Sequence, residues 1–446
     1  MASTSTNTII HGTKSSMRMS SVVPATVTAE EHKVHELTKM DLALKLHYIK
    51  GVYFFGRVEG VTIYDLKKPM FQLLQLYFPA AGRIRRSENG RPFIKCNDSG
   101  VRIVEARCDE TVDEWLAMAL GDDHDSSFDV LAYNQALGDP DLDLSPLVFL
   151  QFTRFKCGGM SVGISWANVL GDAFSASTFI NLWKKIMADP VPHKSLHIPP
   201  DSAKSKLPLS VHPILITPSF LKRVDSVGDL WLTPNNCKMK THTFHVDAEK
   251  INHFLSGQKP KVSAFEVLSA IIWKSLSKIK ENAEETRIVS LCKNKSGERQ
   301  LEFPSNEMVW STVEADFWVA EAEVSELVEL IFNKRKYEND MIEEMMGHDN
   351  ESGEESSDFI AYGAKLTFVN LEEIEIYELE LKGQKPVYAN YAITGVGVEG
   401  VVLVLPGPKC GKERNDVDGD KIVTVVLPEN QLAQLKVELQ KNWNIA

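Results

Sequence analysis

Two polar residues with a spacing suited to catalysis, Asn168 and Asp172, lie in the stretch SWANVLGDAFSAS at residues 165–177. The stretch has the frame of an acyl-transfer site, in which a histidine four residues before the aspartate would act as the base. An imidazole, with a pKa near ~6.5, takes a proton from a hydroxyl and returns it, which contributes roughly 10²- to 10⁴-fold in rate. Position 168 carries a carboxamide, which forms hydrogen bonds but does not titrate. Asn168 could therefore orient a hydroxyl without activating it.

Two interpretations of Asn168 stay open from the residues alone. It is either a relic of a catalytic position that still faces a channel, or a residue under no chemical demand that caps a turn. A replacement base would have to come from elsewhere, because no histidine lies between His124 and His193. The other histidines fall in segments without a catalytic motif, and three are expected to be structural: His47, His245 and His253.

Length and charge restrict the class of protein. A chain of 446 residues suggests two domains of roughly 200 residues each, and 43% hydrophobic with 25% charged residues is typical of a globular protein. A net charge of -12 argues against a nucleic-acid surface, which needs clustered Lys and Arg. The short basic runs at 83–86 and 334–336 are interpreted as solvated faces.

The cysteines indicate a reducing compartment. Six are spread singly, without a CxxC pair or a Cys/His ligand spacing, so we expect no metal site. Cys157 stands beside two glycines at a strand end with no histidine in sequence reach, and we expect it to be buried and inert.

No segment reads as a membrane anchor or a secretory signal. The apolar run at 401–406 is far below the ~20 residues that a transmembrane helix requires. Residues 1–20 lack the apolar core of a secretory signal and are expected to form a disordered leader.

Strand and helix patterns alternate through both halves, which indicates an α/β architecture. We expect an N-terminal domain at 21–188, a Pro- and Ser-rich crossover linker at 189–225 and a C-terminal domain at 226–446. A hairpin of strands at 147–155 and 160–166 delivers the chain to the Asn168 motif, and a helix follows Phe174. Other expectations are listed here: helices at 40–53, 264–279 and 321–346, and a mobile acidic loop at 348–357.

Five ordered segments together resemble the plant BAHD acyltransferase superfamily over nearly the whole chain. They are LTKMD at 37–41 (family LSxxD), YFPAAGRI at 77–84 (FYPLAGR), KCNDSGVRIVEA at 95–106 (CNDxGxxFxxA), FTRFKCGG at 152–159 and LSAIIW at 268–273 (LxAxxW). The resemblance implies two similarly built α/β domains related to chloramphenicol acetyltransferase, each a mixed sheet with flanking helices. It also implies a channel for acyl-CoA between them.

Both family signatures are altered in this chain. HxxxDG appears at 168–173 with Asn168 in place of the histidine and Ala173 in place of the glycine. The aspartate of that motif is structural in the family and commonly pairs with an arginine of the second domain; the equivalent segment here, 291–295, has no arginine. The second signature, DFGWG, corresponds to Glu380, Leu381, Lys382, Gly383 and Gln384, ahead of Lys385-Pro386.

Within the superfamily the chain is similar to the eceriferum group of cuticular-wax proteins. The similarity rests on the 165–177 stretch and on residues 40–48, 225–228 and 356–359. It implies an accessory role in the fatty-acid elongase at the cytosolic face of the endoplasmic reticulum, together with a condensing enzyme, a ketoacyl-CoA synthase. No cofactor is implied, although a long-chain acyl-CoA is a candidate ligand.

Two other functions remain as alternatives. One is an active CoA-dependent O-acyltransferase that works without the usual histidine, because orientation of the reactants alone supplies several kcal/mol. The other is a pure interaction scaffold whose channel has closed.

Overall fold

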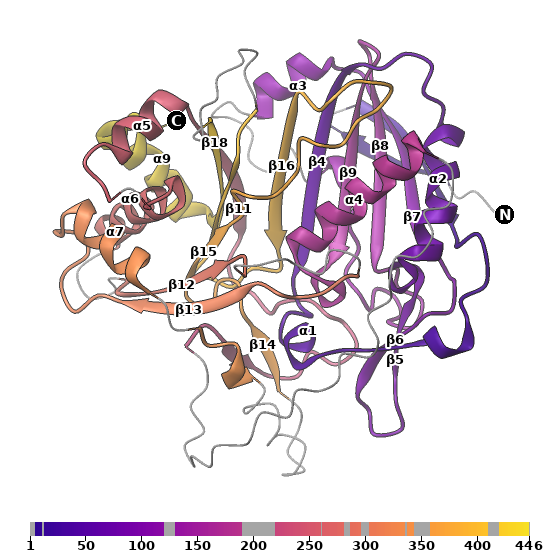
Figure 1. The fold of residues 1–446 in the computed structure, drawn as a ribbon, viewed down its shortest axis with the longest axis horizontal. Helices are drawn as coiled ribbons and strands as arrows, with labels where there is room; N and C mark the ends of the chain where they lie inside the picture. The colour runs from indigo at the N-terminus through magenta and orange to yellow at the C-terminus, as the bar shows by residue number, and fades with distance from the viewer. Residues whose placement is uncertain are drawn as a thin grey trace.

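The fold consists of two large β-sheets with flanking helices (Figure 1). The computed structural model describes residues 5–10, 13–119, 130–189, 219–259, 261–280, 286–295, 303–334, 337–342, 357–408 and 419–445. This mixed α/β architecture confirms the expected fold class.

The first sheet has seven strands in the order β1-β2-β7-β8-β9-β4-β16. β7 and β8 are parallel, whereas the other neighbours in the sheet are antiparallel. Helices α2 (Ile63–Leu76) and α4 (Ala173–Ala188) lie against it in Figure 1. The strands are β1 (Ser5–Ile10), β2 (Thr13–Val22), β4 (Tyr48–Arg57), β7 (Val101–Cys108), β8 (Val148–Phe155), β9 (Gly159–Ala167) and β16 (Tyr388–Thr394).

The second sheet has six strands in the order β11-β18-β17-β15-β12-β13. Its helices gather on its outer face (Figure 1): α5 (Ala248–Leu255), α6 (Ala264–Ile279), α7 (Val324–Asn333) and α9 (Glu429–Trp443). The strands are β11 (Met239–Val246), β12 (Ile288–Lys293), β13 (Val309–Glu314), β15 (Leu366–Asn370), β17 (Val401–Pro406) and β18 (Lys421–Pro428).

Smaller elements lie beside the two sheets. β3 (Val34–Glu36), β5 (Arg83–Arg86) and β6 (Pro92–Lys95) form a three-stranded sheet, and β10 (Lys222–Val224) pairs with β14 (Asp358–Ile360). The short helices are α1 (Lys39–Ala43), α3 (Val112–Ala119) and the 3-10 turn η4 (Asn168–Leu170).

The second half of the chain completes the first sheet. β16 pairs antiparallel with β4, from Tyr388 opposite Phe54 to Thr394 opposite Tyr48. Asn390 of β16 joins the two sheets, since it donates to the Thr243 hydroxyl at 2.9 Å and accepts from the Thr424 hydroxyl at 2.7 Å. A boundary at residue 226 therefore does not separate the sheets, and the expected C-terminal domain extends into the N-terminal one.

The expectation of a helix at 40–53 is wrong beyond its first turn. α1 ends at Ala43, and β4 begins at Tyr48. Seven of the ten residues of β4 are buried, because the strand lies between β9 and β16. A strand buried on both faces shows no polar alternation, so its apolar run is hard to distinguish from a buried helix.

Two other expectations differ from the structure. The 1–20 segment is not a disordered leader throughout, because β2 pairs with β7 from Arg18 opposite Glu105 to Val22 opposite Val101. Of the helix expected at 321–346, residues 340–342 are helical and residues 343–346 lie outside the described part, but the main helix is α7, Val324–Asn333. Beyond it the chain returns to the sheet, where Glu338 accepts from the Thr312 backbone N–H and hydroxyl. The acidic loop at 348–357 lies outside the described residues except for its last one.

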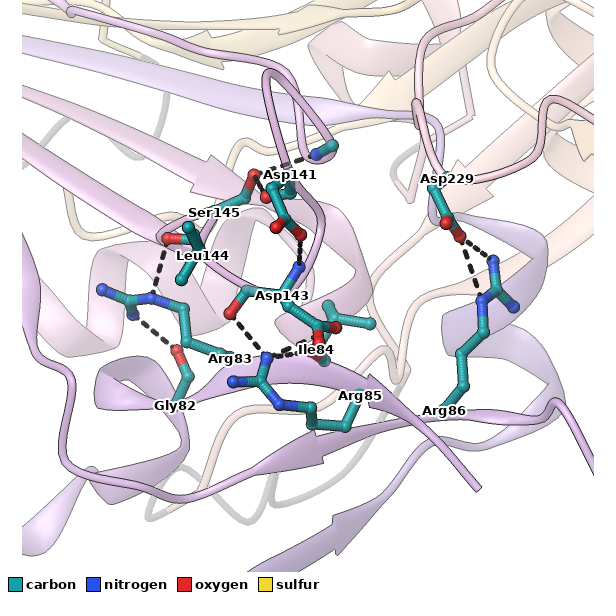
Figure 2. Close-up of polar contacts among 11 residues, drawn as sticks. Gly82, Arg83, Ile84, Arg85, Arg86, Asp141, Asp143, Leu144, Ser145 and Asp229 are labelled. Atoms are coloured by element: carbon teal, nitrogen blue, oxygen red, sulfur yellow. Dashed lines mark hydrogen bonds and ion pairs between the residues drawn. The ribbon is translucent and has the colours of Figure 1, made fainter. Parts of the chain in front are cut away.

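The basic run at 83–86 is only partly a solvated face (Figure 2). Arg83 is buried, and its guanidinium donates to the carbonyls of Gly82 at 2.6 Å, Gly100 at 2.9 Å and Leu144 at 3.2 Å. Burial lowers the pKa of Arg83 to about 9. Arg86, in contrast, forms a more exposed ion pair with Asp229 at 2.6 Å.

We expect Arg83→Leu to lower the free energy of unfolding by about 3 kcal/mol, because it leaves several buried carbonyls without a donor. Arg86→Leu in the same strand is the matched control and should cost less than about 1 kcal/mol, as exposed ion pairs do. Urea unfolding followed by circular dichroism measures both. Equal losses for the two variants would contradict the structural role of Arg83.

Candidate functional site

The Asn168 motif lies where a central strand of the first sheet ends. β8 and β9 form the expected hairpin, and all nine residues of β9 are buried between β8 and β4. The chain leaves β9 at Ala167, turns through η4 and enters α4 at Ala173. Asp172 is the N-cap of α4, and its Oδ1 accepts from the Ser175 N–H at 3.1 Å. A short polar residue at this position satisfies a backbone donor of the first helical turn.

Asn168 is fully buried. Its Nδ2 donates to the Gly171 carbonyl at 3.2 Å, across the turn, and to Oδ1 of Asn306 at 2.8 Å. Its backbone N–H donates to the His47 carbonyl at 3.0 Å. The Oδ1 atom has no hydrogen-bond partner in the described part of the protein. The side chain thus supports the turn and contacts the second half of the chain, as a turn-capping residue would.

Asp172 connects the two halves of the protein through backbone groups. Its Oδ2 accepts from the Glu307 N–H at 3.0 Å, and its own N–H donates to the Ser305 carbonyl at 3.1 Å. Ser175 adds a reciprocal pair with Ser305, since its hydroxyl lies 2.9 Å from the Ser305 carbonyl and 3.1 Å from the Ser305 nitrogen. The carboxylate therefore holds a segment of the second half against the start of α4.

The residues that hold the motif from the other side are Ser305, Asn306 and Glu307, which we call the bridging segment. They precede β13 in a stretch without strand or helix periodicity, so no sequence pattern places them at the site. Asn306 bonds to Asn168 as described, and its Nδ2 donates to the Asn168 carbonyl and to Oδ1 of Asp41, each at 2.8 Å. Asp41 is buried, and burial raises the pKa of its carboxyl.

The backbone carbonyl of His47 accepts from the Asn168 N–H, but the imidazole ring of His47 forms its hydrogen bonds with other parts of the protein. Nε2 accepts from the Ala361 N–H at 3.0 Å, so the proton resides on Nδ1, which donates to the Gly395 carbonyl at 2.9 Å. Burial lowers the pKa of His47 to about 3. A neutral imidazole with both nitrogens in use cannot serve as the base at position 168, which agrees with the structural role expected for it.

The remaining candidate residues lie in ordinary surroundings. His245 forms a half-exposed pair with Asp420 at 3.3 Å. The expectation that Cys157 is buried is wrong: it is exposed in the turn between β8 and β9, where its Sγ lies 3.5 Å from the Val112 nitrogen. Across the described ranges, no group of three or more His, Cys, Asp or Glu side chains could hold a metal ion.

The altered second signature lies far from Asn168. Leu381 and Gln384 exchange backbone hydrogen bonds at 2.9 and 3.0 Å, and Lys382 and Gly383 between them have positive φ, as in a type I′ turn. This turn, which begins after Glu380, leads into β16 at Tyr388, opposite Phe54 of β4. The other end of β4 pairs with Ala167, beside Asn168. At ~3.4 Å per residue, about six residues of strand separate the two sites, roughly 20 Å.

Three segments that carried the eceriferum similarity meet at one place. Lys45 forms an ion pair with Asp358, and Oδ2 of Asp358 accepts from the Val227 N–H at 2.8 Å. The Lys45 ammonium also lies 5.1 Å from the centre of the Trp231 ring. The chain after α1, the end of the crossover and the start of β14 are therefore held together beside the Asn168 motif.

The buried His47 predicts a specific pH dependence of stability. The unfolded chain takes up a proton on this histidine as the pH falls below about 6.5, while the folded protein does not until about pH 3. Its contribution to stability is complete above that range and is lost as the pH falls. The stability advantage of the natural protein over His47→Gln should shrink by about 2 kcal/mol between pH 6.5 and 5. The pKa of Asp41 is shifted in the opposite direction, but both proteins contain Asp41, so its effect cancels when they are compared. Urea titrations of both proteins test it, and a constant difference would contradict it.

Comparisons with known proteins agree with this geometry. A family model described as the Transferase family matches residues 15–442. Protein ECERIFERUM 2 of Arabidopsis thaliana is 41% identical over 438 residues, covering 95% of this chain and 97% of that protein. Protein ECERIFERUM 26 of the same plant is 38% identical over 435 residues, covering 96% and 95%.

Among solved structures, that of vinorine synthase has a similar fold, with a TM-score of 0.68 and 17% identity over 95% of this chain and 97% of that one. The match of the family model over nearly the whole length, with two sheets joined at the Asn168 motif, shows that the chain belongs to the Transferase family of BAHD acyltransferases.

Proposed function

We propose that this protein is a non-catalytic accessory factor of the fatty-acid elongase in very-long-chain acyl synthesis for cuticular wax. Its partner would be a condensing enzyme, a ketoacyl-CoA synthase, at the cytosolic face of the endoplasmic reticulum. The identity to ECERIFERUM proteins over most of the chain supports the link to wax. No helix among the described residues is long and apolar enough to span a bilayer.

The observation that carries the non-catalytic part of the proposal is the chemistry around position 168. Asn168 does not titrate, its side chain is buried, and its amide hydrogens are used within the protein by Gly171 and Asn306. The imidazole of His47, whose backbone carbonyl accepts from the Asn168 N–H, is neutral and bound on both nitrogens. A transferred acyl group would need a base to take the proton of its acceptor, and none of these groups supplies one.

The frame around the motif supports retention of a binding or scaffolding role. Asp172 still caps α4 and joins the two halves, so loss of the base has left the interdomain contact intact. A long-chain acyl-CoA is the candidate ligand, which the protein would present to the condensing enzyme. Binding of such a ligand to the folded state would raise the melting temperature.

Co-expression with a condensing enzyme in a heterologous host tests the accessory role. We expect the acyl-chain distribution to shift to longer chains compared with the condensing enzyme alone, and the two proteins to co-purify. Asn168→Ala, in a variant shown to be folded by circular dichroism, should retain the shift because the amide performs no chemistry. An unchanged distribution together with a lack of co-purification would overturn the proposal.

An assay of the purified protein tests the competing enzymatic function. With a long-chain acyl-CoA and a fatty alcohol, we expect release of CoA at the background rate, because no base activates the alcohol. A family member that keeps the histidine serves as the positive control. Turnover of about 1 s⁻¹ or faster, in the ordinary range of enzymes, would establish the acyltransferase alternative instead.

A further inference from the structure

The side chain of Asn306 accepts the hydrogen bond that the Asn168 amide can donate away from its own turn. In the acyl-transfer signature that residues 168–173 resemble, the histidine at the position of Asn168 would form a hydrogen bond with the hydroxyl of the acceptor. Here the side chain of Asn168 donates to an oxygen of the protein itself, Oδ1 of Asn306, at 2.8 Å. The Nδ2 atom of the same Asn306 amide donates to the Asn168 carbonyl at 2.8 Å, so the two residues are joined twice.

Further contacts fix Asn306 in this place. Its Nδ2 also donates to Asp41, whose Oδ2 accepts from the Thr38 N–H at 2.7 Å. On either side of Asn306, Ser305 and Glu307 bond to the start of α4, as described above. The carboxamide of Asn306 therefore cannot leave Asn168 without breaking three partly buried hydrogen bonds.

The amide of Asn168 is left with one unused group. Its Oδ1 is buried and has no partner among the described residues. A buried acceptor without a donor is unfavourable, so the hydrogen-bonding capacity of the Asn168 amide is only partly used in this position. Its position is set by the turn and by Asn306.

We propose that Asn306 is a positioning residue that occupies the acceptor side of the former catalytic position and keeps residue 168 inaccessible. The inference rests on the proposed accessory function, because it assumes that no acceptor has to reach this position. It has a further consequence: a histidine restored at position 168 would meet the Asn306 amide and would gain access to an acceptor only when Asn306 is removed as well.

Thiol labelling measures this accessibility without reference to activity. The Asn168→Cys variant is compared with the double variant Asn168→Cys/Asn306→Gly, and modification of residue 168 by a maleimide is followed by peptide mass spectrometry. Peptide mapping separates this thiol from the exposed Cys157 and Cys237. We expect labelling to be at least about tenfold faster in the double variant, because local opening is no longer needed.

Two controls keep the result specific. The matched control combines Asn168→Cys with Asn333→Gly, at an exposed position at the end of α7. It should be labelled at the same rate as Asn168→Cys alone. The double variant Asn168→Cys/Asn306→Ser is a second test, because the serine hydroxyl retains a hydrogen-bond donor. Its labelling rate should lie between the rate of Asn168→Cys and that of Asn168→Cys/Asn306→Gly. Circular dichroism and urea titration confirm that each protein is folded.

The outcomes separate this inference from the proposed function. Equal labelling with and without Asn306, or loss of the fold in both Asn306 variants, would overturn the inference that Asn306 controls access. Neither result would affect the elongase co-expression experiment. As a second readout, Asn168→His/Asn306→Gly should release CoA from a long-chain acyl-CoA with a fatty alcohol faster than Asn168→His alone. Equal rates for the two would also overturn the inference.

Discussion

The carboxylate of Asp172 is the interaction on which the rest of the site depends. One oxygen accepts from a backbone N–H of α4 and the other from a backbone N–H of the bridging segment. A single buried side chain thereby fixes the start of a helix and the contact between the two halves of the protein. Ionised carboxylates that accept several backbone hydrogen bonds are held strongly, since such charge-assisted bonds are about twice as strong as neutral ones. The aspartate is therefore useful to the fold whether or not its neighbour performs chemistry.

This division of roles explains how the motif could change without loss of structure. The histidine of the family signature would serve a reaction, whereas the aspartate serves the architecture. At position 168 the asparagine amide donates a hydrogen bond across the turn to the Gly171 carbonyl. It also donates to Oδ1 of Asn306 in the interface between the two halves. Residue 168 thus helps to join the two halves of the protein through its side chain.

The sequence predicted the parts of the fold that depend on local patterns. The β8-β9 hairpin, α4 after the motif and α6 with its Ser263 cap follow from alternation, periodicity and capping residues, and all three are present. β4 was misjudged because a strand buried on both faces carries no alternation. The bridging segment could not have been found, because its importance comes from contacts with residues about 130 positions earlier in the chain. The type I′ turn of the second signature shows the same limit: Lys382-Gly383 predicts a turn but not its distance from Asn168.

The position of β16 has a consequence for how the protein is made. Residues 388–394 form the edge strand beside β4, yet they emerge from the ribosome more than 300 residues after it. Until then β4 presents an open row of backbone donors and acceptors, which invites pairing with other chains. The nascent first half would thus depend on chaperones until residues 388–394 have been made, and fragments that stop before residue 388 should be prone to aggregate.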